Sequence, residues 1–206
     1  MQIDIVDYLK KLNTSENLYL PNPGNAGDAL ISVGTMHLFK KLNIKYEFIT
    51  DRNSFEPGGK TVIYGGGGNL VEYYTNSRSF FIQNHKKLKK LIILPSTISG
   101  HTDLLHEFGK NTDIITRELV SYEFVRRHAP KANVYLSHDM SFYIDKEEVM
   151  TPSFMGTTQI ILKKIFYKII GSKKIKNVPS PEIYIKSRIN ELKLKRNQKN
   201  MDPEMC

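Results

Sequence analysis

Two clusters of glycine and polar residues stand where a strand-like run gives way to a predicted helix. The first, from Asn22 to Asp28, follows the apolar run Leu18-Tyr19-Leu20. Glycines in such a turn let backbone N–H groups approach a phosphate or carboxylate at the helix end. We therefore predict that Asn25 and Gly27 bind a ligand. Asp28 is a candidate acid or base that could equally cap the helix.

The second cluster is a run of four glycines, Gly65, Gly66, Gly67 and Gly68, followed by Asn69. Glycine loses more backbone entropy on folding than any other residue, so four together indicate that a ligand or another stretch of backbone comes very close. The Asn69 amide both donates and accepts hydrogen bonds, as recognition of sugar hydroxyls requires. Neither glycine cluster matches a Walker loop or the dinucleotide-binding fingerprint.

Two further clusters add hydroxyls and a guanidinium. Ser96 follows the apolar run 91–94, and Arg117-Glu118 follows the run 114–116. Arg117 offers a planar fork of donors for a carboxylate or phosphate, or forms an ion pair with Glu118 or Asp113. Ser96 and Arg117 are predicted to bind substrate, and Glu118 is a candidate catalytic acid or base.

The last cluster is Ser137-His138-Asp139, after the final apolar run. His138 could act as an acid or base near neutral pH, or could be a structural histidine. With Asp139 it completes the set of catalytic candidates. The other histidines show no metal-ligand spacing and Cys206 is the one cysteine, so we expect no metal site.

The elements that must position these clusters alternate between strand and helix. Strands are predicted at 18–20, 46–49, 61–64, 91–94, 114–116 and 134–136, and helices at 27–41, 77–90 and 118–128. Alternation of this kind indicates a doubly wound α/β domain with a mostly parallel sheet, here over residues 1–150. In such sheets ligands bind at the carboxyl ends of the strands, where the clusters fall.

The positive charge is concentrated after residue 150. Residues 151–206 carry 12 Lys/Arg and 4 Asp/Glu, so nucleic acid is not the expected partner of the nearly neutral domain. This basic, partly helical extension contains an amphipathic segment, 156–174, which either docks on the preceding domain or lies on a membrane surface. The chain begins without a signal peptide, which predicts a cytoplasmic protein, peripheral at the inner face of the membrane if that segment binds lipid.

Taken in order, the clusters resemble the polysaccharide pyruvyl transferases. The motifs are Asn25-Ala26-Gly27-Asp28, Gly65 to Asn69, Leu94-Pro95-Ser96, Arg117 to Ser121 and Leu136 to Asp139. The resemblance covers about Asn17 to Asp145. It implies one half of a GT-B-like architecture, followed by a shortened second half.

The resemblance also implies an activity: transfer of pyruvate from phosphoenolpyruvate to two sugar hydroxyls, as a ketal, in exopolysaccharide or cell-wall polysaccharide synthesis. The donor is a substrate and no cofactor is implied. The acceptor would be a sugar or a lipid-linked oligosaccharide, and homo-oligomers are compatible with the sequence. Two alternatives stay open: a sugar-nucleotide-dependent glycosyltransferase, and a truncated, non-catalytic remnant.

Overall fold

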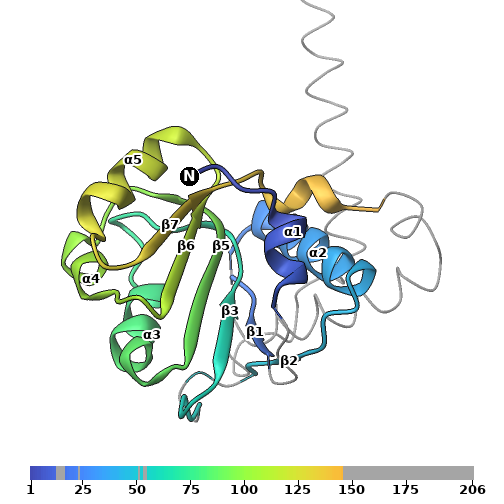
Figure 1. The fold of residues 1–206 in the computed structure, drawn as a ribbon, viewed down its shortest axis with the longest axis horizontal. Helices are drawn as coiled ribbons and strands as arrows, with labels where there is room; N and C mark the ends of the chain where they lie inside the picture. The colour runs from blue at the N-terminus through green and yellow to red at the C-terminus, as the bar shows by residue number, and fades with distance from the viewer. Residues whose placement is uncertain (13–16, 23, 51, 53–54, 146–206) are drawn as a thin grey trace, which may run out of the picture. The chain divides into compact units, whose positions relative to one another are not determined.

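The computed structural model describes residues 1–12, 17–22, 24–50, 52 and 55–145 (Figure 1). Its strands are β1 (Asn17–Leu20), β2 (Tyr46–Phe48), β3 (Thr61–Tyr64), β4 (Gly67–Leu70), β5 (Lys90–Ile98), β6 (Thr112–Thr116) and β7 (Asn133–Leu136). Its helices are α1 (Ile5–Lys10), α2 (Ala26–Lys41), α3 (Asn76–Asn84), α4 (Thr102–Glu107) and α5 (Leu119–His128), with 3-10 turns η1 (His85–Lys87) and η2 (Met140–Tyr143).

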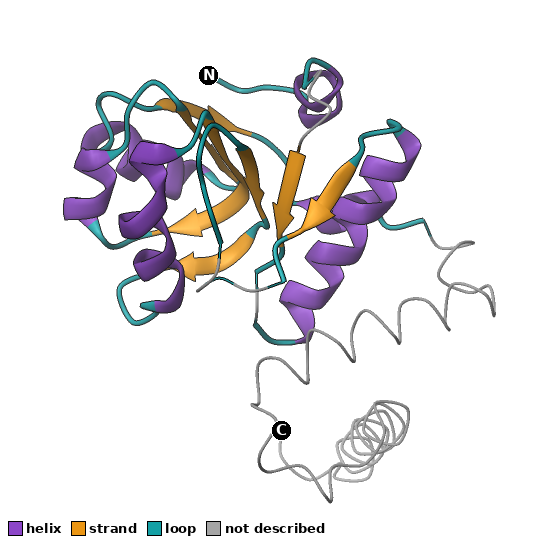
Figure 2. Cartoon of the chain, turned by 90° about the horizontal axis from the view of Figure 1, so that it is seen from below, coloured by secondary structure: helices purple, strands orange, loops and turns teal. Residues whose placement is uncertain are grey.

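The strands form one parallel sheet with helices on both faces. The strand order is β2-β1-β3-β5-β6-β7, and β4 also pairs with β5. Helices α1 and α2 lie on one side and α3, α4 and α5 on the other (Figure 1), and Figure 2 shows helices on both sides of the strands. The prediction of a doubly wound α/β domain is confirmed.

Alternation along the strands explains why both faces are covered. Successive side chains point to opposite faces of a sheet. Val62 and Tyr64 of β3 pack in the same apolar cluster as Phe81 of α3. Ile63, between them, packs in the cluster that holds Phe39 of α2. Each buried strand therefore needs apolar residues at every position, which is why these strands read as continuous apolar runs.

The direction of winding reverses between β1 and β3. From β1 the chain crosses through α2 to β2, on one side, whereas from β3 onward it proceeds to β5, β6 and β7 on the other side. The carboxyl ends of β1 and β3 therefore flank a topological switch point, the place where open α/β sheets bind ligands.

Two predicted element ends differ most from the structure. The strand predicted to end at Leu94 runs on to Ile98, with a shift in its pairing to β6 between Ile93 and Ser96. Pro95 is tolerated there because an irregularity removes the need for its missing N–H. The helix predicted over 77–90 ends at Asn84 and continues as the 3-10 turn η1.

The glycine run, expected as a loop, contains a strand. β4 continues the line of β3 alongside β5, since Tyr64 pairs with Ile93 and Gly67 pairs with Ser96. The predicted boundary at residue 150, the basic extension over 151–206 and the amphipathic segment 156–174 lie outside the described residues and stay predictions.

Candidate functional site

The first two clusters meet at the switch point. Gly67, the first residue of β4, lies against the side chains of Asn22 and Asp28: a Cβ built on it would be 2.5 Å from Asn22 Nδ2 and closer still to an Asp28 carboxylate oxygen. Gly67 has φ of 131°, a conformation that favours glycine. The turn after β1 and the glycine run are therefore in direct contact.

Asp28 has a structural role at this place. Asn25 caps α2 by accepting from the Gly27 amide at 2.7 Å and the Asp28 amide at 3.4 Å, and Asp28 Oδ2 accepts from the Asn25 amide at 3.0 Å. Asp28 Oδ1 accepts from Asn22 Nδ2 at 3.0 Å. This reciprocal capping box occupies the first-turn amides. A ligand at the α2 end would have to displace the Asn25 side chain, so the predicted roles of Asn25, Gly27 and Asp28 in binding and catalysis stay predictions.

The four glycines differ in what surrounds them. A side chain on Gly65 would meet the Asn22 backbone nitrogen at 2.7 Å, and one on Gly66 would meet the Pro95 carbonyl oxygen. Gly68 is different, because apart from its chain neighbours no described residue has an atom within 4 Å of the place where its Cβ would be. The described residues thus leave room for a ligand beside the Gly68 backbone, and the contact between bare amides and a ligand stays a prediction. Asn69 lies in β4, and its side chain is outside the described part of the chain.

A buried tyrosine connects the switch point to two more elements. The Tyr64 hydroxyl donates to Asn22 Oδ1 at 3.2 Å and lies 2.5 Å from Ser77 Oγ at the start of α3. Arg52, which follows β2, lies near enough to this hydroxyl for its positive charge to affect the pKa of Tyr64. Burial raises the pKa of Tyr64, while Ser77 and Arg52 act in the opposite direction.

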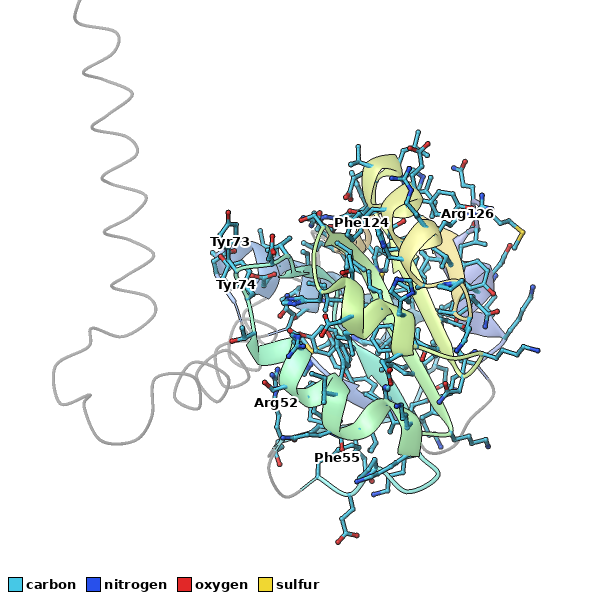
Figure 3. All side chains as sticks on the ribbon, turned by 90° about the vertical axis from the view of Figure 1, so that its left-hand side faces the viewer. Arg52, Phe55, Tyr73, Tyr74, Phe124 and Arg126 are labelled. Carbon is cyan, nitrogen blue, oxygen red and sulfur yellow. The ribbon has the colours of Figure 1, made fainter. Side chains whose placement is uncertain are left out.

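Asn22 and Tyr64 stand at the start of the two predicted glycine clusters but were assigned no role, and Ser77 and Arg52 were missed in the sequence. Arg52, Asn22 and Tyr64 each follow or end a predicted strand, so their shared position at the sheet edge was the signal that could have found them. Figure 3 labels Arg52 together with Tyr73 and Tyr74, two exposed tyrosines that follow β4.

A second polar cluster is built around Arg117, directly after β6. Arg117 Nε donates to Thr97 Oγ1 at 2.8 Å and Nη1 donates to Asp139 Oδ2 at 2.7 Å, while Glu118 lies 4.0 Å away. The alternative that Arg117 forms an ion pair with Glu118 or Asp113 is correct for Glu118, whereas its closest partner, Asp139, was not predicted. It is wrong for Asp113, which accepts from Lys90 Nζ at 2.6 Å.

The other predicted residues flank this cluster. Glu118 accepts from the hydroxyl of Ser121 and from Thr97 Oγ1. Ser96 is buried inside β5, and its hydroxyl donates to the Leu94 carbonyl at 2.7 Å. His138 is exposed, with its ring 6.0 Å from that of Phe142.

Both clusters lie on the carboxyl edge of the sheet, as predicted. The pairings Gly67–Ser96, Ser96–Thr116 and Thr116–Leu136 run across this edge from β4 to β7. One cluster presents amide, hydroxyl and carboxylate groups beside an open backbone position. The other presents a guanidinium between carboxylates. The guanidinium can bind an anion, and the carboxylates beside it can transfer protons.

The described residues offer neither a cluster of metal ligands nor a membrane-spanning helix. They contain no group of three or more His, Cys, Asp or Glu that could hold a metal ion. In the same residues, no helix combines the length and the apolar character that crossing a membrane demands.

Comparison with known proteins identifies a matching family and a solved structure of similar fold. A family model described as polysaccharide pyruvyl transferase matches residues 25–198, and thus includes most of the segment predicted as a basic extension. Among solved structures, the chain is similar to a functionally uncharacterized protein from Klebsiella pneumoniae, at 30% identity and a TM-score of 0.63. The similarity covers 72% of this chain and 58% of that one, so the chain spans less than two thirds of that relative. The curated proteins gave no match.

Proposed function

The chain belongs to the polysaccharide pyruvyl transferase family, and from this premise we propose that it transfers pyruvate from phosphoenolpyruvate to a pair of sugar hydroxyls. The product is a cyclic ketal on a sugar of a polysaccharide or of its lipid-linked precursor. The family match and the two polar clusters on one sheet edge support this proposal.

The proposed reaction needs two proton transfers and one departing anion. Protonation of the phosphoenolpyruvate methylene makes a methyl group and an electron-poor carbon, which the first sugar hydroxyl attacks. The proton of that hydroxyl passes to the acid–base group that protonated the methylene. The second hydroxyl then attacks the same carbon, phosphate leaves with the C–O electron pair, and the second hydroxyl's proton passes to phosphate. The site must therefore bind an anionic donor and hold acid–base groups beside it.

Arg117 is the observation that carries the proposal. Its hydrogen bonds to Thr97 and Asp139 use Nε and Nη1. The Nη2 group donates to neither of these two residues. Its side chain is 31% exposed, so a ligand can reach it. A guanidinium fixed in this way is pre-organised to bind a carboxylate or phosphate with little loss of side-chain freedom.

Acid–base groups surround that guanidinium. The Glu118 and Asp139 carboxylates lie beside Arg117, and either can accept the proton of an attacking hydroxyl. His138 precedes Asp139 and is exposed at the same edge, where its imidazole is a further group that can donate or accept a proton. We assign proton transfer to Glu118, His138 and Asp139, and donor binding to Arg117.

The test is phosphoenolpyruvate binding by the full chain, measured by calorimetry, with phosphate release measured in the presence of sugar acceptors. We expect Arg117→Ala to weaken binding about 10- to 100-fold, the value of one or two charge-assisted hydrogen bonds. Arg127→Ala is the matched control, because Arg127 is an exposed arginine in the last turn of α5, the helix that begins just after Arg117.

Three outcomes separate the alternatives. Loss of binding in Arg117→Ala but not in Arg127→Ala supports the donor site, provided that both variants unfold at the wild-type temperature. Release of a nucleoside diphosphate from a sugar nucleotide, without phosphoenolpyruvate binding, would instead indicate a glycosyltransferase. A folded chain that turns over neither donor would be a non-catalytic remnant.

A further inference from the structure

Ser121, a buried residue in the first turn of α5, makes two hydrogen bonds whose directions follow from chemistry. Its Oγ accepts from the Ile98 backbone amide at 2.8 Å, and the same hydroxyl contacts Glu118 Oε1. An amide N–H can only donate, so the one proton of the Ser121 hydroxyl is donated to Glu118. The end of β5 therefore holds the Glu118 carboxylate through the Ser121 side chain.

Thr97 repeats this pattern on the other carboxylate oxygen. Its Oγ1 accepts from Arg117 Nε at 2.8 Å, so its own proton is available for Glu118 Oε2, which lies 3.4 Å away. The hydroxyl that orients the guanidinium thus also faces the carboxylate. Arg117 and Glu118 are held in one connected network.

Helix capping does not account for a glutamate at position 118. Glu118 is the N-cap residue of α5, yet its side chain makes no capping hydrogen bond to the described residues. The usual capping box has serine or threonine at the N-cap and glutamate three residues later, and here that order is reversed. The Glu118 carboxylate is bonded instead to Ser121 and Thr97.

The two carboxylates beside Arg117 differ in how far a substrate can reach them. Asp139 accepts at both oxygens, from Arg117 at 2.7 Å and from the Ser141 amide at 2.8 Å, and its side chain is 14% exposed. The Glu118 side chain is 39% exposed, although its partner Ser121 is buried. Glu118 therefore combines a buried anchor with access from solvent.

This arrangement fits one step of the proposed reaction. The group that protonates the methylene then receives the proton of the attacking hydroxyl, and between the two transfers a carboxyl group would be a carboxylate. Glu118 lies with both oxygens facing hydroxyl donors, as a carboxylate requires. Such a group must lie within hydrogen-bond reach of the proton it takes, and a misplacement of about 1 Å can lower the rate about 100-fold.

We propose that Glu118 is the group that gives and then regains this proton, and that Ser121 is the positioning residue that holds it. The inference rests on the proposed function for the identity of the donor and of the attacking hydroxyl. As the hydroxyl oxygen bonds to the electron-poor carbon, its proton passes to the Glu118 carboxylate, which restores the starting carboxyl group.

The test follows phosphate release by the full chain with phosphoenolpyruvate and sugar acceptors. Ser121→Ala should lower kcat by at least about tenfold. Phosphoenolpyruvate affinity, measured by calorimetry, should change less than about twofold, because Arg117 keeps its bonds to Thr97 and Asp139. Ser32→Ala is the matched control, since Ser32 is also a buried helical serine but lies in α2, on the opposite face of the sheet (Figure 1).

A double-mutant cycle separates positioning from support of the fold. Glu118→Gln should lower kcat by about 100-fold or more. Adding Ser121→Ala to Glu118→Gln should then change kcat by less than about twofold, because Ser121 acts through the Glu118 carboxylate. A serine that only supported α5 would cost as much in the Glu118→Gln chain as in the wild type.

Each result bears on the inference separately from the proposed function. Unchanged kcat in a folded Ser121→Ala chain, or equal losses with and without Glu118→Gln, overturns the inference and leaves the pyruvyl transfer standing. If Ser121→Ala does not fold, Glu118→Asp decides, because its shorter side chain draws the carboxylate away from Ser121: a kcat close to that of the wild type overturns the inference, and a loss of at least about tenfold supports it. A wild type that consumes no phosphoenolpyruvate removes the proposed function, and the inference with it.

Discussion

At the scale of single residues, the Tyr64 hydroxyl is the atom on which most of the switch-point contacts converge. Replacing it with hydrogen in Tyr64→Phe would leave Asn22 Oδ1 and the Ser77 hydroxyl without their partner inside the protein. Buried polar groups left unsatisfied cost about 1–3 kcal/mol. We expect the free energy of unfolding, measured in urea, to fall by about that amount.

Tyr46→Phe is the control for this variant. Tyr46 is a half-buried tyrosine of β2 that packs against the rings of Tyr19 and Phe39, and its hydroxyl makes no hydrogen bond to the described residues. Its removal should change stability by less than about 0.5 kcal/mol, as for substitutions away from structural features. Equal losses in the two variants would show that Tyr64 stabilises the fold through its ring alone.

Residue types alone predicted part of this site. Asp28 after a glycine turn carries the signature of a helix cap, and the structure shows that cap. Arg117 at a strand end was predicted to bind substrate or to pair with Glu118 or Asp113, yet its closest partner, Asp139, follows another strand. Arg52, Asn22 and Tyr64 come from three different strand ends, and only the order of strands in the sheet brings them together.

At the scale of elements, the end of α3 carries a pH-sensitive group. Burial lowers the pKa of His85 below its ordinary value of 6.5, Lys86 adds to the effect and Glu107 opposes it. A histidine with a depressed folded-state pKa binds fewer protons when folded than when unfolded. Between 6.5 and the lower folded value, the free energy of unfolding must therefore fall as pH falls.

The measurement is urea unfolding from pH 8 to pH 5, the range in which histidines titrate. We expect His85→Phe, which keeps a ring against Phe108, to lose stability less steeply than the wild type below pH 6.5. His106→Gln removes an exposed histidine of α4 and should follow the wild-type curve. Parallel curves for His85→Phe and the wild type would contradict the assignment.

The elements that were predicted correctly are those with long apolar runs. The strand at 61–64 has the predicted bounds, and the helix predicted over 27–41 differs only in beginning at Ala26, because buried strands and long helices leave clear patterns. Strand β4 was missed because glycine is depleted in strands, and its pairing with β5 depends on distant residues. Helices α1 and α4 have six residues each, too few for a helical period to stand out.

At the scale of the whole molecule, charge separates the two parts of the sequence. Residues 1–150 carry 18 Lys/Arg and 17 Asp/Glu, whereas 151–206 carry a large excess of positive charge. The family match extends through most of that second part, to residue 198. Most of these basic residues therefore lie within the region that the family model matches.

This excess predicts salt-dependent binding of the full chain to vesicles that contain anionic lipid. Each Lys or Arg near such a surface contributes about 1 kcal/mol, and screening lengths fall from about 10 Å at 0.1 M salt to about 3 Å at 1 M. In a vesicle sedimentation assay we expect binding that is lost at high salt and weakened at least tenfold by glutamine at Lys163, Lys164 and Lys168. The control replaces three exposed lysines of the described part, Lys11, Lys41 and Lys110, in the same way. Equal loss in both triple variants would show that net charge alone, and not segment 156–174, attracts the chain to the membrane.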